Sequence, residues 1–270
     1  MLVLLPPSEG KAGTGGGPRL DPAGLSLPGL REARERVLDA LVALSAEGGQ
    51  QALDVLGLSP GQAGELARNA ALREAATLPA AELYTGVLYD ALELATLGPE
   101  ARRRATSSVL VASGLWGALR LDDRVPPYRC SIGVKGLPVG PGGKPQGLAA
   151  YWKRPLADTL PAASGDGLVL DLRSGAYAAA WKPAGEVARR TATVRVLHER
   201  EVGGVLKRSV VSHFNKATKG RLLRALLESG ADPVSPDELV VALRDLKHTV
   251  EVGPATPSGI VPLDVVVSEI

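Results

Sequence analysis

Residues 109–133 read VLVASGLWGALRLDDRVPPYRCSIG, and this stretch decides the fold and points to the functional region. Its apolar beginning predicts a buried strand that ends at Ser113-Gly114. The following Gly114-Leu115-Trp116-Gly117 has the spacing of a hairpin between two short helices, a device that offers backbone N–H groups to a phosphate. A purely structural turn is the alternative, because Gly-x-x-Gly turns occur in many folds. The stretch therefore indicates a ligand site at a strand end.

Length and composition are those of an ordinary globular protein. The chain has 270 residues, of which 45% are hydrophobic, enough to bury a large core in a single domain spanning residues 1–270. No window holds the roughly 18 apolar residues of a membrane span, and residues 1–5 are too short for a secretory signal. The single cysteine, Cys130, excludes an intramolecular disulfide and a cysteine-based zinc site within one chain. We expect a cytoplasmic protein without membrane contact.

The charge balance restricts how the protein could meet a polyanion. Its 31 basic and 29 acidic residues give a formal charge of +2, too balanced for a histone-like coat. A polyanion would have to bind at a local cluster, although each cluster taken singly is more commonly a solvated face. The candidates are Arg102-Arg103-Arg104, Arg189-Arg190, Lys207-Arg208 and the group Lys216, Lys219, Arg221 and Arg224.

Strand and helix patterns alternate along the rest of the chain. A buried strand at residues 2–5 stops at Pro6-Pro7 and leads into a polar loop. Apolar spacings of three and four predict helices between residues 30 and 97. Later segments predict a helix at 151–160, a strand at 168–172, a short helix at 174–180, paired strands at 191–212 and a basic helix at 216–229. This alternation predicts an α/β or α+β domain with a mixed sheet surrounded by helices.

Several familiar chemical motifs are excluded. Gly10-Lys11 follows a strand, but Leu5 and Ala12 stand where a phosphate-binding P-loop needs glycine and a hydroxyl residue. Pro18 breaks the glycine pattern of a dinucleotide site, and the three histidines lack the spacing of a helix-borne metal site. Cys130 has no readable histidine partner for nucleophilic chemistry. We predict no cofactor and no metal.

Motifs distributed over most of the chain resemble the YaaA peroxide-stress family. They are the first strand with its Pro/Ser-rich loop, Tyr84-Thr85-Gly86, Ser113 to Gly117 with Leu119-Arg120 and Asp122, Pro127-Tyr128-Arg129 with Gly133, Tyr151-Trp152, Leu170-Asp171-Leu172 with Ser174 and Tyr177, and Lys216-Ala217 with Gly220-Arg221. Two features mark a divergent branch. The region beyond Lys247 is not recognisably similar, and Ser8-Glu9-Gly10-Lys11 replaces the plainer Ser-Pro-Ala-Lys form.

The resemblance implies a single-domain α/β fold with a helix-hairpin-helix element and a positively charged cleft. It also implies sequence-nonspecific DNA binding and a protective role against peroxide, with no firmly attached reaction. The hairpin amides would face a phosphate, and Arg120 and Arg129 would be the nearest fixed cations. The residues expected to bind phosphate are Ser8, Lys11, Thr85, Gly114, Leu115, Gly117, Arg120, Arg129, Lys216 and Arg221.

An enzyme acting on a nucleotide- or nucleoside-like small molecule is the alternative function. Its candidate catalytic residues are Lys11, Asp171, Tyr84 and Ser113. A site that only binds phosphate needs mainly cations and backbone amides, whereas this set also contains hydroxyl groups and a carboxylate. Asp171 would be a general base or a ribose-hydroxyl acceptor, or else the N-cap of the helix near Ser174. Trp116 would stack on a ligand or anchor the core. A scaffold without a ligand ranks last, because it leaves the polar residues at strand ends unexplained.

Overall fold

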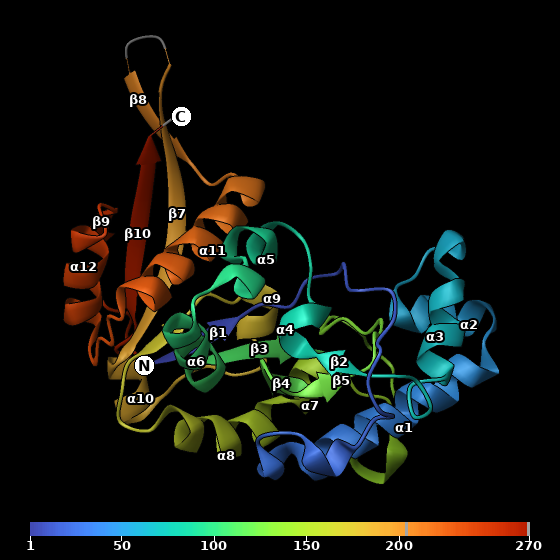
Figure 1. The fold of residues 1–270 in the computed structure, drawn as a ribbon. Coiled ribbons are helices and arrows are strands. Elements are labelled where there is room, and N and C mark those ends of the chain that lie inside the picture. Colours follow the sequence, from blue (N-terminus) through green and yellow to red (C-terminus); the bar gives the residue numbers. More distant parts are fainter. Residues whose placement is uncertain (203–204, 269–270) are drawn as a thin grey trace.

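The strands predicted at the start, middle and later part of the chain lie side by side at the centre of one sheet. The computed structural model describes residues 1–202 and 205–268, and its eight-stranded sheet has the order β4-β3-β1-β6-β7-β10-β9, with β8 paired to β7 (Figure 1). Strands β3, β1, β6, β7 and β10 are parallel, whereas β4, β8 and β9 run antiparallel to their neighbours. The predicted single-domain α/β fold with a mixed sheet is therefore confirmed.

The strands occupy the following residues: β1 Leu2–Leu5, β2 Leu78–Pro79, β3 Val109–Ser113, β4 Gly117–Arg120, β5 Arg124–Val125, β6 Val169–Asp171, β7 Thr191–Val202, β8 Val205–Ser209, β9 Thr249–Val252 and β10 Val261–Ser268. The α-helices are α1 Arg31–Glu47, α2 Gly49–Leu56, α3 Gly64–Ala70, α4 Ala80–Leu83, α5 Val87–Leu92, α6 Pro99–Ser108, α7 Leu148–Tyr151, α8 Lys153–Ser164, α9 Gly175–Ala178, α10 Gly185–Arg189, α11 Ser212–Ser229 and α12 Pro236–Asp245. β2 and β5 form a separate two-stranded sheet. No helix in the described ranges is long and apolar enough to cross a membrane.

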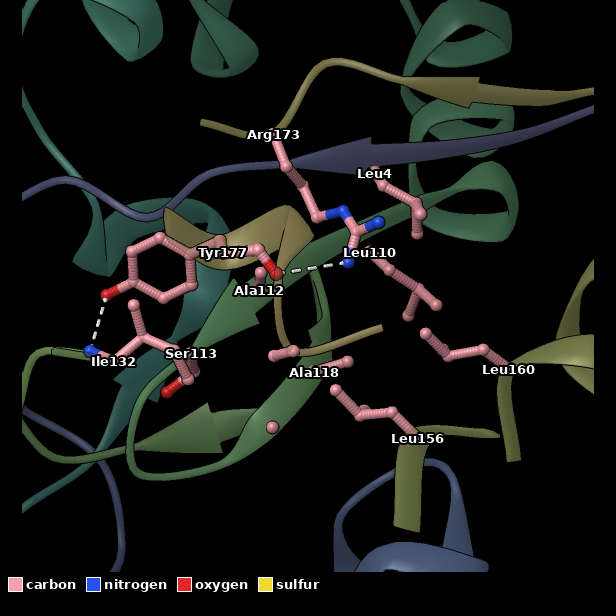
Figure 2. Close-up of a pocket in the computed structure, with 12 residues that line it drawn as sticks. Leu4, Leu110, Ala112, Ser113, Ala118, Ile132, Leu156, Leu160, Arg173 and Tyr177 are labelled. Carbon is pink, nitrogen blue, oxygen red and sulfur yellow. Dashed lines mark hydrogen bonds between the residues drawn. The ribbon is translucent and has the colours of Figure 1, made fainter. Parts of the chain in front are cut away.

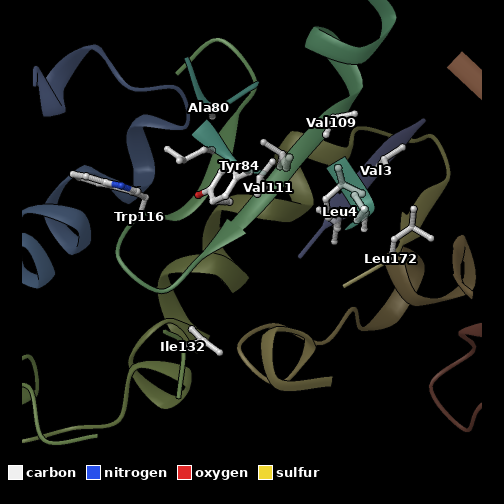
Figure 3. Packing of buried hydrophobic residues seen from close by; sticks show 14 of the residues in the cluster. Val3, Leu4, Ala80, Tyr84, Val109, Val111, Trp116, Ile132 and Leu172 are labelled. Atoms are coloured by element: carbon white, nitrogen blue, oxygen red, sulfur yellow. The ribbon is translucent and has the colours of Figure 1, made fainter. Parts of the chain in front are cut away.

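Strand β1 lies between β3 and β6 in the interior of the sheet, and both of its faces are covered by side chains. All four of its residues are buried, which is typical of parallel strands between helical layers. Leu4 lies with Leu110 against Leu156 and Leu160 of α8, and the register pairs Val3 with Val109. Figure 3 shows Val3, Leu4, Val109, Val111 and Tyr84 packed around β1 and β3. The same core continues to Leu263 and Val265 of β10, so one hydrophobic cluster spans the chain.

The Gly-Leu-Trp-Gly motif forms a β-hairpin, and this corrects the expected helix-hairpin-helix element. Its residues join β3 to the antiparallel β4, with Ser113 opposite Gly117. Gly117 has φ +70°, and the ring of Trp152 packs so closely on it that a Cβ would lie 2.7 Å away. On the N-terminal side, α6 ends at Ser108 and β3 follows directly. Glycines fit a tight turn between two helices as well as one between two strands. The apolar residues of β3 favour a strand, so the turn is that of a β-hairpin.

A close helix contact positions the side chains that matter for function. Helices α11 and α5 pack against each other beside the sheet (Figure 1). At Gly220 of α11, a Cβ atom would lie 2.3 Å from the carbonyl oxygen of Leu88 in α5. Only glycine allows this approach. As a result, the first turns of α11 face the start of α5 across a narrow gap.

Candidate functional site

Two adjoining pockets lie beyond the carboxyl ends of β1 and β6, the edge where open α/β sheets usually bind ligands. Their volumes are about 560 Å³ and about 80 Å³, and both are lined by Pro7, Ser8, Glu9 and Tyr177. The larger one continues between α5 and α11, whereas the smaller one reaches Lys11 and Arg129. We call the two together the basic pocket.

Positive charge dominates the basic pocket. Four basic side chains line it, namely Lys11, Arg129, Lys216 and Lys219. Among the lining residues in the described ranges, Glu9 is the single acidic one, and its carboxylate accepts a hydrogen bond of 3.2 Å from Arg129. The protein as a whole is nearly neutral, so this excess of cations is local. Such a cluster favours an anionic ligand.

Lys11 is held in a confined, partly aromatic environment. Its Nζ donates a hydrogen bond of 2.9 Å to the carbonyl oxygen of Ser8 and lies 4.6 Å from the ring centroid of Tyr128. Its backbone forms an isolated antiparallel bridge with Tyr84. Burial, and then the positive charge of Arg129, lower the pKa of Lys11 to about 8. The ammonium is therefore easier to deprotonate than an exposed lysine.

Tyr84 and Ser113, two of the candidate catalytic residues, lie behind Lys11 in a buried hydrogen-bond chain. The hydroxyl of Tyr128 lies 2.9 Å from that of Tyr84 and 2.6 Å from Oγ of Ser113. Oγ of Ser113 also accepts a hydrogen bond from the amide of Trp116. Burial raises the pKa of Tyr84 and of Tyr128 above the usual value. This chain fixes the floor of the pocket and does not line it.

Arg129 is fixed through its backbone. Its amide donates to Oδ1 of Asn69 at 2.9 Å, and Nδ2 of Asn69 donates back to its carbonyl oxygen at 2.8 Å. Asn69 is fully buried, so this segment has little freedom to move. The guanidinium binds the Glu9 carboxylate, which is 87% exposed. Arg129 is thus a preplaced cation with a weakly held partner.

Asp171 is engaged with Arg173 and is not the N-cap of α9, which was one of the alternatives that the sequence left open. Nη2 and Nε of Arg173 donate to its two carboxylate oxygens at 2.7 and 2.8 Å, and both side chains are buried. Arg173 donates further to the carbonyl oxygens of Tyr177 and Trp181, and the first of these bonds is visible in Figure 2. Ser174 is the N-cap residue of α9. Asp171 therefore holds Arg173, which fixes the loop carrying Ser174 and Tyr177, and Arg173 engages both of its carboxylate oxygens.

Lys216 and Lys219 come from the first turns of α11. The Nζ of Lys219 donates to the carbonyl oxygen of Leu172 at 3.3 Å, which ties the helix to the end of β6. Burial lowers the pKa of Lys219, and the nearby Asp171 opposes that shift. Lys216 is exposed at the mouth of the pocket. The basic helix predicted from the sequence thus supplies two cations to the site.

The predicted phosphate-binding set is divided by the structure. Ser8, Lys11, Thr85, Arg129 and Lys216 meet at the basic pocket. The others lie elsewhere: Arg120 donates to the carbonyl oxygen of Ser107 at the opposite end of β3, Arg221 lines a separate pocket with His198 and Phe214, and Gly114, Leu115 and Gly117 are buried. The hairpin residues are buried because the backbone at Cys130 and Ser131 covers Gly114, where a Cβ would lie 2.5 Å from the Cys130 carbonyl oxygen.

Several polar lining residues were not among the predicted site residues, and Tyr89, Asn215 and Lys219 are three of them. Asn215 and Lys219 are four residues apart at the start of α11, so they lie on one face of the helix. This spacing is visible in the sequence and could have indicated that the two residues act together. Tyr89 could not be found, because its ring stacks on Tyr84 and its hydroxyl donates to Pro6, both long-range contacts.

Metal-binding chemistry finds no support in the described parts of the chain. Within residues 1–202 and 205–268, no three His, Cys, Asp or Glu side chains form a group that could hold a metal ion. Cys130 lines the smaller pocket but is buried, and burial raises the pKa of its thiol to about 12. The basic pocket thus combines four cations with a fixed floor.

The sequence of this chain is similar to those of known proteins. The family model described as "Peroxide stress protein YaaA" matches residues 1–246. The chain belongs to the YaaA peroxide-stress family. A UPF0246 protein of Streptomyces coelicolor is 59% identical over the whole length of both chains. UPF0246 proteins of Corynebacterium efficiens and Corynebacterium glutamicum are 42% and 39% identical, covering 93% and 94% of this chain and 95% and 96% of the relatives.

The loop Ser8-Glu9-Gly10-Lys11 of this YaaA-family protein lies in the basic pocket itself. Oγ of Ser8 donates to the carbonyl oxygen of Gly10 and accepts from the amide of Thr85. Glu9 contacts Arg129, so the loop places both a carboxylate and a lysine in the site.

Proposed function

We propose that this YaaA-family protein binds the phosphate backbone of DNA at the basic pocket, without reading sequence, as part of the protection against peroxide. The observation that supports the proposal is the gathering of Lys11, Arg129, Lys216 and Lys219 along two adjoining pockets of a nearly neutral protein. Cations on a rigid support bind phosphates and release the counterions of the duplex. No base-reading element is needed for such contacts.

The test is a fluorescence-anisotropy titration with a labelled duplex at several salt concentrations. If the four cations each neutralise one phosphate, the logarithm of the binding constant falls with the logarithm of the salt concentration with a slope of about −3.6. Lys11→Ala/Arg129→Ala should weaken binding and reduce the slope by about 1.8. The control is Lys153→Ala/Arg154→Ala, which removes an exposed lysine and an exposed arginine from α8, away from the pocket.

Binding that is equally lost in both double variants would contradict the proposed site. DNA binding that neither variant changes would place the DNA-binding site outside the basic pocket. The protective role has its own test: a strain lacking the protein should be more sensitive to peroxide, and the Lys11→Ala/Arg129→Ala variant should fail to restore resistance. If that variant fully restores resistance to peroxide, the protective role does not depend on this pocket.

A second function, an enzyme acting on a nucleotide-like small molecule, is favoured by Lys11 alone. A lysine with a pKa of about 8 can give or take a proton near neutral pH, as general acid–base catalysis requires. Turnover of a nucleotide that Lys11→Arg abolishes, while duplex binding persists, would support this second function.

A further inference from the structure

A separate pocket lies between α11 and the two-stranded ribbon of β7 and β8, which projects from the body of the molecule (Figure 1). Its volume is about 340 Å³, and we call it the ribbon pocket. Strand β7 contributes His198 and Arg200 to its lining, and α11 contributes Phe214, Thr218 and Arg221. The basic pocket is lined by other residues of α11, and the two pockets have no lining residue in common. The ribbon pocket is therefore a site of its own.

The lining of the ribbon pocket is cationic and rich in hydrogen-bond donors. Arg200 and Arg221 carry the positive charge, and they come from two different elements. Ser209 and Thr218 add hydroxyl groups, and none of the lining residues that the structure describes is acidic. Both arginines are exposed to solvent, so an incoming ligand can reach them. Such a lining favours an anion.

The charges of the two arginines are not balanced by acidic side chains. In the described ranges, neither Arg200 nor Arg221 forms an ion pair, whereas Arg208 of the same ribbon is paired with Glu199 and Glu251. Side chains alternate along a strand, so Glu199 lies on the face of the ribbon opposite to Arg200. One face of the ribbon thus holds paired charges, and the face toward the pocket holds cations.

The register of the ribbon places a further cation on the same face. Arg200 lies directly opposite Lys207 in the pairing of β7 with β8. Like charges at directly opposite positions destabilise a pair of strands. A bound anion would remove this repulsion, so the pairing is explained by a ligand that supplies negative charge.

We infer that the ribbon pocket binds a phosphate-bearing anion, held by Arg200 and Arg221. A guanidinium donates two parallel hydrogen bonds to phosphate oxygens, and two guanidinium groups offer more donors than the two oxygens of a carboxylate can accept. The hydroxyl groups of Ser209 and Thr218 supply donors for the remaining phosphate oxygens. A volume of about 340 Å³ is in the range of small-ligand pockets. The inference does not rest on the proposed function, because the residues of the two sites differ.

NMR of the histidine side chains tests the inference, with pyrophosphate as the probe in a phosphate-free buffer at constant pH. His198 lines the ribbon pocket, whereas His248 lines neither this pocket nor the basic pocket. Pyrophosphate should shift the imidazole signal of His198 until the site is saturated and leave the signal of His248 unchanged. Acetate should shift neither signal. The variant His198→Gln assigns the signal.

Arg200→Gln/Arg221→Gln should weaken the binding measured at His198 by about tenfold or more, because each change removes a charged hydrogen-bond donor. The matched control is Arg31→Gln/Arg154→Gln, which removes two exposed arginines from α1 and α8 and should leave this affinity unchanged. An affinity that the two double variants share with the wild-type protein overturns the inference. A His198 signal that responds equally to acetate, or that moves with neither pyrophosphate nor DNA, also overturns it.

A DNA duplex distinguishes the two sources of the phosphate. If the DNA backbone supplies it, the duplex shifts the His198 signal, and Arg200→Gln/Arg221→Gln reduces the salt slope of duplex binding by about 1.8. If pyrophosphate binds while the duplex changes neither the signal nor the slope, the ligand is a small phosphate compound. Both results support the ribbon pocket. The variant Lys11→Ala/Arg129→Ala tests the basic pocket separately, so either site can fail without the other.

Discussion

The positive charge of Lys11 destabilises the folded protein but is needed to bind a phosphate. The pKa of this lysine is lowered from 10.5 to about 8, so between these values the unfolded chain binds a proton that the folded chain has released. Stability therefore rises with pH across this window, and below pH 8 the full cost of burying the charge is present. Binding of a phosphate needs that same charge. A group that weakens the fold and fits a ligand is typical of a functional site.

We predict that Lys11→Met raises the free energy of unfolding by about 2 kcal/mol at pH 7, because it removes a buried charge. The gain should nearly vanish at pH 10.5, where the native lysine is already neutral. Urea denaturation of both proteins at the two pH values measures the difference in their free energies of unfolding. Other titrating groups contribute equally to the two proteins and cancel in this difference. A gain of the same size at both values would contradict the assigned pKa. In the wild-type protein, phosphate affinity should also fall as pH rises through 8.

Cys130 should take no part in sensing peroxide. Peroxide reacts with the thiolate, and burial raises the pKa of this thiol to about 12, although the charge of Lys11 partly opposes that shift. We predict that the folded protein keeps its thiol reduced in peroxide and reacts slowly with a thiol reagent, whereas the unfolded protein reacts at once. Rapid modification of the folded protein would contradict this prediction. Cys130→Ala should leave DNA binding unchanged, because the residue contributes only packing.

At the scale of elements, the approach of α11 to α5 decides the shape of the pocket. We predict that Gly220→Ala lowers the free energy of unfolding by about 1–3 kcal/mol, because its Cβ would lie 2.3 Å from a backbone oxygen that cannot move freely. The usual helix gain of alanine over glycine, about 1 kcal/mol, is smaller than this clash. Gly64→Ala in α3, where a Cβ meets nothing within 4 Å, is the control and should be neutral or stabilising.

Thermal or urea unfolding of both variants measures the effect. Equal stability of Gly220→Ala and wild type would show that the helices can separate without cost. In that case, the pocket walls would not be fixed by this contact.

The sequence predicts the elements that carry the site better than it predicts how they are arranged. The strands predicted at residues 2–5 and 168–172 and the basic helix predicted at 216–229 follow from apolar runs and amphipathic spacing, which are local properties. The structure has them at Leu2–Leu5, Val169–Asp171 and Ser212–Ser229. The hairpin at Gly114 could not be assigned in this way, because the same glycines serve a turn between strands or between helices. The separation of Arg120 from Arg129 depends on β4 running antiparallel to β3, which is a matter of pairing across the sheet.

At the scale of the whole molecule, the fold depends on a segment that lies beyond the part matched by the family model. The family match ends at residue 246, yet β10 follows it and pairs in parallel with β7 from Val261 to Ser268. Leu263 and Val265 of this strand are fully buried in the common core. Strand β7 is in turn paired with β6, at the edge where the basic pocket opens. The C-terminal segment therefore supports the site from the far side of the sheet.

We predict that a chain ending at Leu246 fails to fold into a stable protein. It loses the pairing of β10 with β7 and the burial of Leu263 and Val265, which contribute about 1.5–3 kcal/mol each. Together with the lost strand pairing, this approaches the 5–15 kcal/mol that stabilise a typical domain. Circular dichroism during heating measures the effect, with a chain ending at Ser268 as the control. A cooperative transition near the wild-type temperature in the shorter chain would mean that residues 1–246 form a complete folding unit, and that β9 and β10 are additions to it.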